Sequence, residues 1–313
     1  MKKAAIWLLN AVDHLVPKQD KILLRGLPDV EDQCLSMLQA LARRQYRGTV
    51  AWVMRSTPAG LEAVRRQYGL DSLHLRVCRS GGLSAVGHFL TARFVLFTHG
   101  AYSQGDWGNY TPPRGKTVVN MWHGMPIKAI WKFLPGAAES PRANVLLATS
   151  PRFQQVMAEA SGMPEEQVWV TGLPRNDMLQ WRAAEAENSI RELVGDGPWY
   201  LYLPTYRKSK AGFPVQDGCE HESVLAMSGD EIATLDRWLR DAGIKLVVKA
   251  HPLSVHARAR HANLTDNIAV ISEGWLTDHQ LTLYGLAGYS AGLITDLSSV
   301  VVDYLLLDRP VFI

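Results

Sequence analysis

The clearest chemical pattern in the chain spans residues 292–313, GLITDLSSVVVDYLLLDRPVFI. A short apolar run leads into a turn at Asp296, and the following residues predict a helix with Ser298 as its N-cap, continuing to about residue 307. Helix N-termini present unpaired backbone N–H groups and partial positive charge, so hydroxyls at Ser298 and Ser299 suit a phosphate or diphosphate. Simple helix capping is the alternative, and the local sequence alone favours it.

Two histidines also follow predicted strands. His123 in VVNMWHGMPIK precedes Gly124, which allows close backbone approach to a ligand, so its imidazole is a candidate general base. A structural histidine packed beside Trp122 is the alternative. His251 in KLVVKAHPLS ends another strand and can donate a hydrogen bond to a phosphate or a proton to a leaving group.

Two arginines occupy similar positions after Pro-containing turns. Arg207 in YLPTYRKSK offers a guanidinium that matches phosphate geometry, with solvation beside Lys208 as the alternative. For Arg175 in VTGLPRND, a structural role as an interdomain brace and helix cap, together with Asn176 and Asp177, is the favoured interpretation. Asp303 and Asp308 lack a metal-binding spacing, and neither a metal nor a cofactor is predicted.

Short β-branched runs alternate with helical patterns along the whole chain, which is typical of parallel α/β units. The expected strands are residues 21–25, 49–54, 73–78, 94–98, 117–122, 145–149, 168–171, 199–203, 245–249, 268–271, 292–295 and 310–313. A charged helical segment at 178–194 connects the two series, so we expect domains at 1–180 and 181–313.

In open parallel sheets, ligands bind beyond the carboxyl ends of the strands. Small, hydroxylic and basic residues gather after these strand ends, and the candidates for binding or catalysis are His123, Gly124, Arg207, His251, Thr295, Asp296, Ser298 and Ser299.

Composition bounds the class of protein. A net charge of +3 from 33 basic and 30 acidic residues gives no argument for nucleic-acid binding. Three scattered cysteines support neither a disulfide framework nor a zinc site and fit a reducing cytoplasm. An amphipathic helix is expected at the N-terminus. Packing on the core is its favoured role, and contact with a membrane surface is the alternative.

Six ordered motifs together resemble the CDP-glycerol glycerophosphotransferase family, which includes teichoic-acid and capsule polyol-phosphate transferases. They are WHGMPIK at 122–128, TSPRF at 149–153, VTGLPRND at 170–177, YLPTYR at 202–207, KAHP at 249–252 and LITDLSSVVVDYLLLDRPVF at 293–312. The resemblance implies a GT-B-like α/β fold, in which two Rossmann-like domains with parallel sheets face a central cleft. It places the acceptor on the first domain and the nucleotide donor on the second.

The implied reaction is attack by an acceptor hydroxyl on the β-phosphorus of a CDP-linked polyol, with release of CMP. The acceptor would be a teichoic-acid-like, capsular or lipid-linked polymer at the inner face of the cell membrane. By this resemblance His123 is the general base, and His251 contacts the diphosphate or stabilises the leaving group. Ser298 and Ser299 cradle phosphate, Arg207 neutralises the donor, and Asp296 shapes the turn.

Two departures accompany the resemblance. Met125 stands where the family usually has Thr after its WHG, and the second domain is expected to be truncated because the sequence stops inside a predicted strand. A GT-B glycosyltransferase that uses a nucleotide sugar and a non-catalytic donor-binding module are the alternative functions. Glycerol and ribitol are both open as the transferred polyol.

Overall fold

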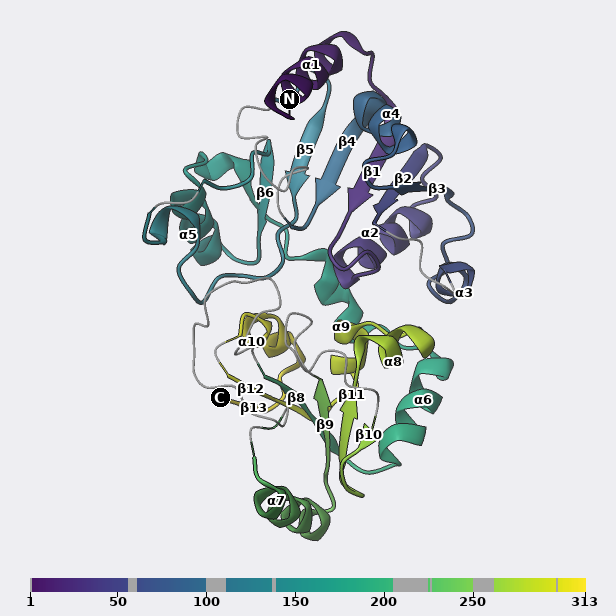
Figure 1. The fold of residues 1–313 in the computed structure, drawn as a ribbon, viewed down its shortest axis with the longest axis vertical. Coiled ribbons are helices and arrows are strands. Elements are labelled where there is room, and N and C mark those ends of the chain that lie inside the picture. Colours follow the sequence, from purple (N-terminus) through teal and green to yellow (C-terminus); the bar gives the residue numbers. More distant parts are fainter. Residues whose placement is uncertain are drawn as a thin grey trace. The chain divides into compact units, whose positions relative to one another are not determined.

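The computed structural model describes residues 2–55, 61–99, 111–136, 139–204, 225, 227–249, 262–296 and 298–313. The candidates Arg207 and His251 lie outside these ranges. The chain divides into two compact units, Met1–Asn176 and Asp177–Ile313 (Figure 1). Each unit is built around its own sheet.

The first unit holds a seven-stranded sheet in the order β3-β2-β1-β4-β5-β6-β7. Its strands are β1 (Gln19–Arg25), β2 (Thr49–Met54), β3 (His74–Arg79), β4 (Ala92–Phe97), β5 (Thr117–Asn120), β6 (Val145–Ala148) and β7 (Val168–Val170). All neighbouring pairs are parallel. The strand order reverses between β1 and β4, and such a switch point is where open α/β sheets bind ligands.

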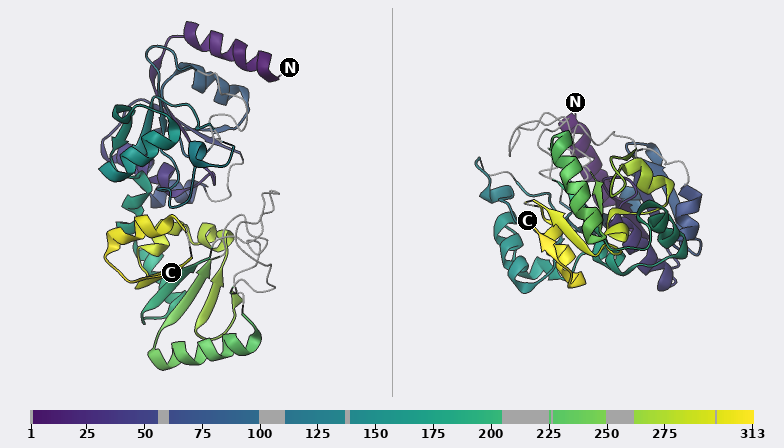
Figure 2. Two further views of the ribbon diagram at one scale, coloured as in Figure 1. Left: turned by 90° about the vertical axis from the view of Figure 1, so that its left-hand side faces the viewer. Right: turned by 90° about the horizontal axis from the view of Figure 1, so that it is seen from below.

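The helices of this unit are α1 (Lys2–Leu15), α2 (Asp32–Arg43), α3 (Leu61–Gln67), α4 (Leu83–Thr91) and α5 (Pro151–Ser161). Helix α4 contacts β1 to β4, and its Ala85 and Phe89 join the buried strand residues Leu23, Val95 and Phe97 in one apolar cluster. Helix α1 lies beside α4 (Figures 1 and 2), which confirms the helix expected at the N-terminus.

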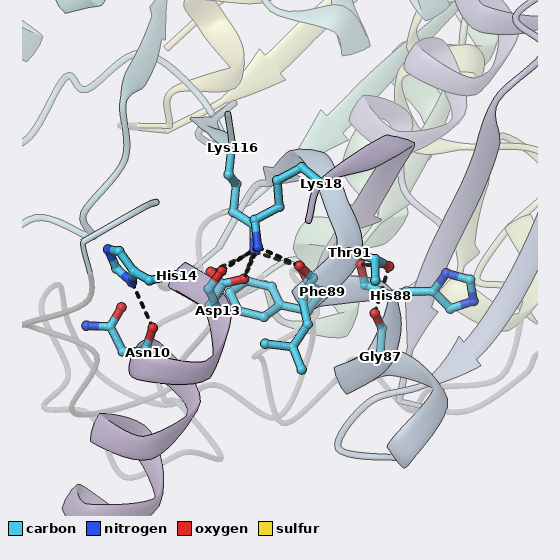
Figure 3. Close-up of polar contacts among 10 residues, drawn as sticks. Asn10, Asp13, His14, Lys18, Gly87, His88, Phe89, Thr91 and Lys116 are labelled. Atoms are coloured by element: carbon cyan, nitrogen blue, oxygen red, sulfur yellow. Dashed lines mark hydrogen bonds and ion pairs between the residues drawn. The ribbon is translucent and has the colours of Figure 1, made fainter. Parts of the chain in front are cut away.

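A buried ion cluster attaches α1 to the rest of the unit (Figure 3). Asp13 is fully buried, and its carboxylate accepts from Lys116 Nζ at 2.6 and 2.8 Å and from Lys18 Nζ at 2.8 Å. The two ammonium groups also donate to the Phe89 and Leu90 carbonyls at 2.7 Å. Burial lowers the pKa of Lys116 to about 8, while the hydrogen bond and charge of Asp13 oppose that change.

The second unit holds a six-stranded sheet in the order β10-β11-β9-β8-β12-β13. Its strands are β8 (Trp199–Leu203), β9 (Lys245–Lys249), β10 (Ala262–Asn263), β11 (Ile268–Ile271), β12 (Gly292–Thr295) and β13 (Val311–Phe312). Its helices are α6 (Ala184–Val194), α7 (Gly229–Ala242), α8 (Glu273–Asp278), α9 (Leu283–Ala287) and α10 (Val300–Tyr304). The order reverses between β8 and β12, so this sheet has its own switch point.

All twelve predicted strands are present, within a few residues of their predicted ends. The purely parallel arrangement was wrong in one place, because the short strand β10 runs antiparallel to β11. In the part of the chain that is described, no helix has the length and apolar composition needed to cross a membrane.

The helix predicted from residue 178 begins later. Residues Pro174–Gln180 form 3-10 turns, and α6 starts only after Ala183. The reason is a set of tertiary bonds to the intervening residues, in which Arg182 donates to the Gly288 carbonyl and the Ala183 N–H donates to the Tyr289 hydroxyl.

We expect Asp13→Asn to lower the free energy of unfolding by about 3–5 kcal/mol, because two buried ammonium groups lose their carboxylate partner. Urea denaturation followed by tryptophan fluorescence measures the change. The matched control is Glu62→Gln, which breaks an Arg65 pair whose carboxylate is 76% exposed, and it should cost less than about 1 kcal/mol. Equal effects of the two substitutions would contradict a structural role for the cluster.

Candidate active site

The first candidate site lies at the carboxyl ends of β4 and β5, next to the switch point of the first sheet. Thr98 and His99 directly follow β4, and Met121, Trp122 and His123 follow β5. Residues 94–97 pair in register with residues 117–120, so both connections leave the same sheet edge side by side. The predicted clustering of strand-end residues is therefore present at this edge.

The connection after β5 is a sharply bent turn. Trp122 has a φ of 58° and Gly124 a φ of 134°. A left-handed conformation is unusual for a bulky side chain, so the surroundings must hold Trp122 there. At Gly124 the backbone adopts a conformation that favours glycine, which is a structural reason for a glycine after His123.

Side chains from three other parts of the unit bind the backbone of this turn. The Asn120 side chain accepts from the Trp122 N–H at 3.0 Å. Gln33 Nε2 donates to the carbonyls of Met121 and Trp122 at 3.3 and 2.9 Å. Arg175 Nη1 donates to the His123 carbonyl at 2.7 Å. The bent turn is thus held on both sides of Trp122.

The imidazole of His123 is held by a hydrogen bond and by stacking. Its Nδ1 lies 3.2 Å from the Thr98 carbonyl oxygen. Because a carbonyl can only accept, the neutral ring must carry its hydrogen on Nδ1, which leaves the Nε2 lone pair available as a base. The ring stacks on His99 with centroids 4.1 Å apart and contacts Trp122 at 3.9 Å.

Burial keeps both stacked histidines neutral. It lowers the pKa of His123 to about 4; the hydrogen bond to the Thr98 carbonyl opposes this shift, and the charge of Arg175 adds to it. The pKa of His99 falls to about 3 through burial and the neighbouring His123 and Arg175. Near neutral pH, the His123 imidazole can therefore accept a proton without first having to lose one.

The second candidate site follows β12 in the second unit. Thr295 is opposite Leu203 of β8, at the switch point of this sheet, and its hydroxyl donates to the Leu203 carbonyl at 2.6 Å. The Ser298 N–H then donates to the Asp296 carbonyl at 2.7 Å and forms a tight turn. The N-cap of α10 is consequently Ser299 instead of the predicted Ser298, and its side chain makes no capping hydrogen bond.

Buried polar contacts fix α10 behind this turn. Tyr284 donates to the Asp303 carboxylate at 2.6 Å, and the hydroxyls of Tyr304 and Ser290 lie 2.8 Å apart. Asp303, Ser290 and Tyr304 are each at most 1% exposed. The sequence predicted an ordinary helix role for Asp303. In the structure, its buried hydrogen bond to Tyr284 anchors α10, the helix that follows the turn from Thr295 to Ser299.

An ion pair with a buried lysine lies at the carboxyl end of β9 in the second sheet. Lys249 at the end of β9 is 3% exposed, and its Nζ lies 2.8 Å from Glu273, the first residue of α8. Among the described residues, no group of three or more His, Cys, Asp or Glu side chains is placed to bind a metal ion.

Several site residues were missed from the sequence. His99 had no distinctive sequence context, yet it stacks on His123. Gln33 was not singled out at all. Arg175 was predicted to be an interdomain brace and helix cap, and its guanidinium binds the His123 carbonyl while its N–H binds Gln33. Met125, where a hydroxyl was expected from the resemblance, is fully buried.

Comparison with known proteins shows which family the chain matches. A family model described as CDP-Glycerol:Poly(glycerophosphate) glycerophosphotransferase matches residues 8–313. A teichoic acid glycerol-phosphate transferase of Staphylococcus aureus is 25% identical over 66% of this chain and 53% of its own length. A teichoic acid ribitol-phosphate primase of Bacillus spizizenii is 28% identical over 63% of this chain and 46% of its own. The chain thus spans about half the length of these curated relatives.

The fold also has a counterpart among solved structures. The wall teichoic acid polymerase TagF superimposes with a TM-score of 0.71 at 17% identity, over 99% of this chain and 74% of that chain. This likeness and the two sheet orders confirm the expected GT-B-like α/β fold with Rossmann-like units.

We expect imidazole NMR of the full chain to show His123 in the Nδ1–H form and to give a titration midpoint of about 4. Because this pKa lies below the ordinary value of 6.5, the unfolded chain binds more protons between the two values. The contribution of His123 to stability is therefore complete above about pH 6.5 and is lost as the pH falls toward about 4. A midpoint near 6.5 would contradict the buried environment described above.

Proposed function

The chain belongs to the CDP-glycerol:poly(glycerophosphate) glycerophosphotransferase family, and on that premise we propose that it is a polyol-phosphate transferase. It moves glycerol phosphate, or a related polyol phosphate, from the CDP-linked donor to a hydroxyl of a teichoic-acid-like or capsular polymer. The observation that carries this proposal is the geometry of His123 at the carboxyl end of β5, next to a sheet switch point, with Nδ1 on the Thr98 carbonyl and Nε2 left as a base.

In the proposed reaction, the acceptor oxygen attacks the β-phosphorus of the donor. A new P–O bond forms, the bond between the β-phosphorus and the oxygen of CMP breaks, and His123 Nε2 takes the hydroxyl proton. Transfer of this kind depends mainly on positioning and charge neutralisation. We assign the neutralising groups to Arg207 and His251, both of which lie outside the described residues.

We assign the donor to the second unit and the acceptor to the first. The turn from Thr295 to Ser299 supports this assignment because it lies at the switch point of the second sheet. Ser298 and Ser299 contribute hydroxyls to the diphosphate, Asp296 shapes the turn, and Thr295 ties the turn to β8. In the first unit, Gly124 lets the acceptor approach the backbone beside His123.

The proposed place of action is the cytoplasmic face of the cell membrane, where a lipid-linked acceptor would be presented. In this proposal the partners are a polymer acceptor and a CDP-polyol donor. Nucleic acid is not a partner.

Replacing His123 with Ala should slow CMP release from CDP-glycerol in the presence of a poly(glycerol phosphate) primer by about 10²- to 10⁴-fold, because the base is lost. His251→Ala should also lower the rate. The matched control is His74→Ala, an exposed histidine at the start of the edge strand β3, and it should leave the rate unchanged. Unchanged CMP release in both site variants would refute the site assignment.

The same assay separates the alternative functions. Release of UDP from a UDP-sugar, with no CMP from CDP-glycerol, would identify a glycosyltransferase. Tight CDP binding without turnover would identify a donor-binding module. Parallel reactions with CDP-ribitol determine which polyol is transferred.

The pH dependence of kcat/KM should show its acidic limb near pH 4, because burial holds the pKa of His123 at about that value. Below this limb the imidazole is protonated and cannot accept a proton. An acidic limb near 6.5, the ordinary value, would exclude His123 in this environment as the base.

A further inference from the structure

A buried amide from a distant part of the sequence binds the backbone of the turn that precedes the candidate base. Gln33 lies in the first turn of α2 and is 1% exposed. Its Nε2 donates to the carbonyls of Met121 and Trp122, and its Oε1 accepts from the Arg175 N–H at 2.9 Å. Gln33 thus joins the connection after β1, the turn after β5 and the segment after β7.

These three contacts fix the orientation of the amide. The two carbonyls can only accept, so the NH₂ group must face them, and the backbone N–H can only donate, so the oxygen must face it. A flipped amide would lose all three hydrogen bonds. The position therefore requires one donor group and one acceptor group in this order, which among uncharged side chains of this length only Gln supplies.

The base of α2 is itself well anchored. Glu31 is the N-cap, and its carboxylate accepts from the N–H groups of Gln33 and Cys34 at 2.9 and 2.8 Å. Burial raises the pKa of Glu31, while these hydrogen bonds and the charge of Arg175 oppose that change. The amide of Gln33 consequently projects from a rigid helix start.

These hydrogen bonds hold the strained turn that directly precedes the candidate base. Trp122 is held at a φ of 58°, and its carbonyl is bound to Gln33 while its N–H is bound to Asn120. The next residue is His123, whose carbonyl is bound to Arg175. Loss of the donor would leave two carbonyls without it at a strained turn, and relaxation of the turn would move the imidazole.

We propose that Gln33, acting with Arg175, is a positioning residue that locks the turn at Trp122 and thereby sets the orientation of the His123 imidazole. The inference rests on the proposed function, in which His123 is the base. In this proposal Gln33 itself contacts neither the acceptor oxygen nor the β-phosphorus. Its effect on the rate comes from the placement of Nε2, since a shift of about 1 Å can cost about 100-fold in rate.

Two substitutions test the proposal in the full chain. Gln33→Met keeps the approximate length and removes the hydrogen bonds. Gln33→Glu keeps the shape and the acceptor for the Arg175 N–H, but places a carboxylate oxygen against two carbonyls. Each should lower kcat for CMP release about 10- to 100-fold, with a change in KM for CDP-glycerol of less than about twofold.

A pH comparison provides a second signature. Protonation of the carboxylate that Gln33→Glu introduces restores one donor toward the carbonyls, so the rate of this variant relative to the original chain should rise as the pH is lowered toward about 5. The Gln33→Met variant should show no such recovery. A merely stabilising role for Gln33 predicts no difference between the two pH profiles.

The control is Ser36→Ala, a residue on the same helix that is also 1% exposed. Its hydroxyl has no hydrogen-bond partner among the residues that the structure describes, so kcat should not change. Circular dichroism and urea denaturation followed by tryptophan fluorescence verify that all variants are folded. Folded Gln33 variants with an unchanged kcat and unchanged His123 imidazole signals would overturn the proposal.

Imidazole NMR separates this inference from the proposed function. If the original chain releases no CMP, the proposed function fails, and the Nδ1–H signal of His123 still reports on positioning. A shifted or lost signal in both Gln33 variants, with an unchanged signal in Ser36→Ala, supports the positioning role. A signal that is the same in all three variants refutes it.

Discussion

The left-handed turn at Trp122 is the constraint on which the first unit's site depends. A bulky residue adopts this conformation only when its surroundings compensate for the strain. Here the compensation comes from Asn120, Gln33 and Arg175, which bind the backbone on both sides of the turn. The parallel sheet makes this possible, because the ends of β1, β4, β5 and β7 meet along one edge and bring these side chains together.

In the second unit, other polar contacts hold the turn after β12 in place. The turn from Thr295 to Ser299 begins at the switch point of the second sheet, and the Thr295 hydroxyl donates to the neighbouring strand β8. Helix α10 behind the turn is short, so its position depends on tertiary contacts, chiefly the buried pairs of Asp303 with Tyr284 and Tyr304 with Ser290. In both units, buried polar side chains hold a connection at the sheet edge in place.

The sequence predicted the strands and the positions that follow them, because both depend on local patterns of apolar and turn residues. It placed His123 at a strand end for this reason. It did not reveal Gln33 or His99, since their roles come from partners distant in the chain: Gln33 and Arg175 are 142 residues apart. The start of α10 was one residue off, because the tight turn after Asp296 uses Ser298 before the helix begins.

Burial positions His123 and at the same time makes it a weaker base. Stacking on His99 and packing against Trp122 fix the ring, but the same removal from water lowers its pKa to about 4. For the proposed transfer, a fixed ring compensates for the lower pKa. Transfer to phosphorus depends mainly on positioning and charge neutralisation, so a well-aligned hydroxyl can react even where the base is weak. A neutral imidazole that is held in place with Nε2 available as a base meets that requirement, and in the proposed account Gln33 contributes to this placement.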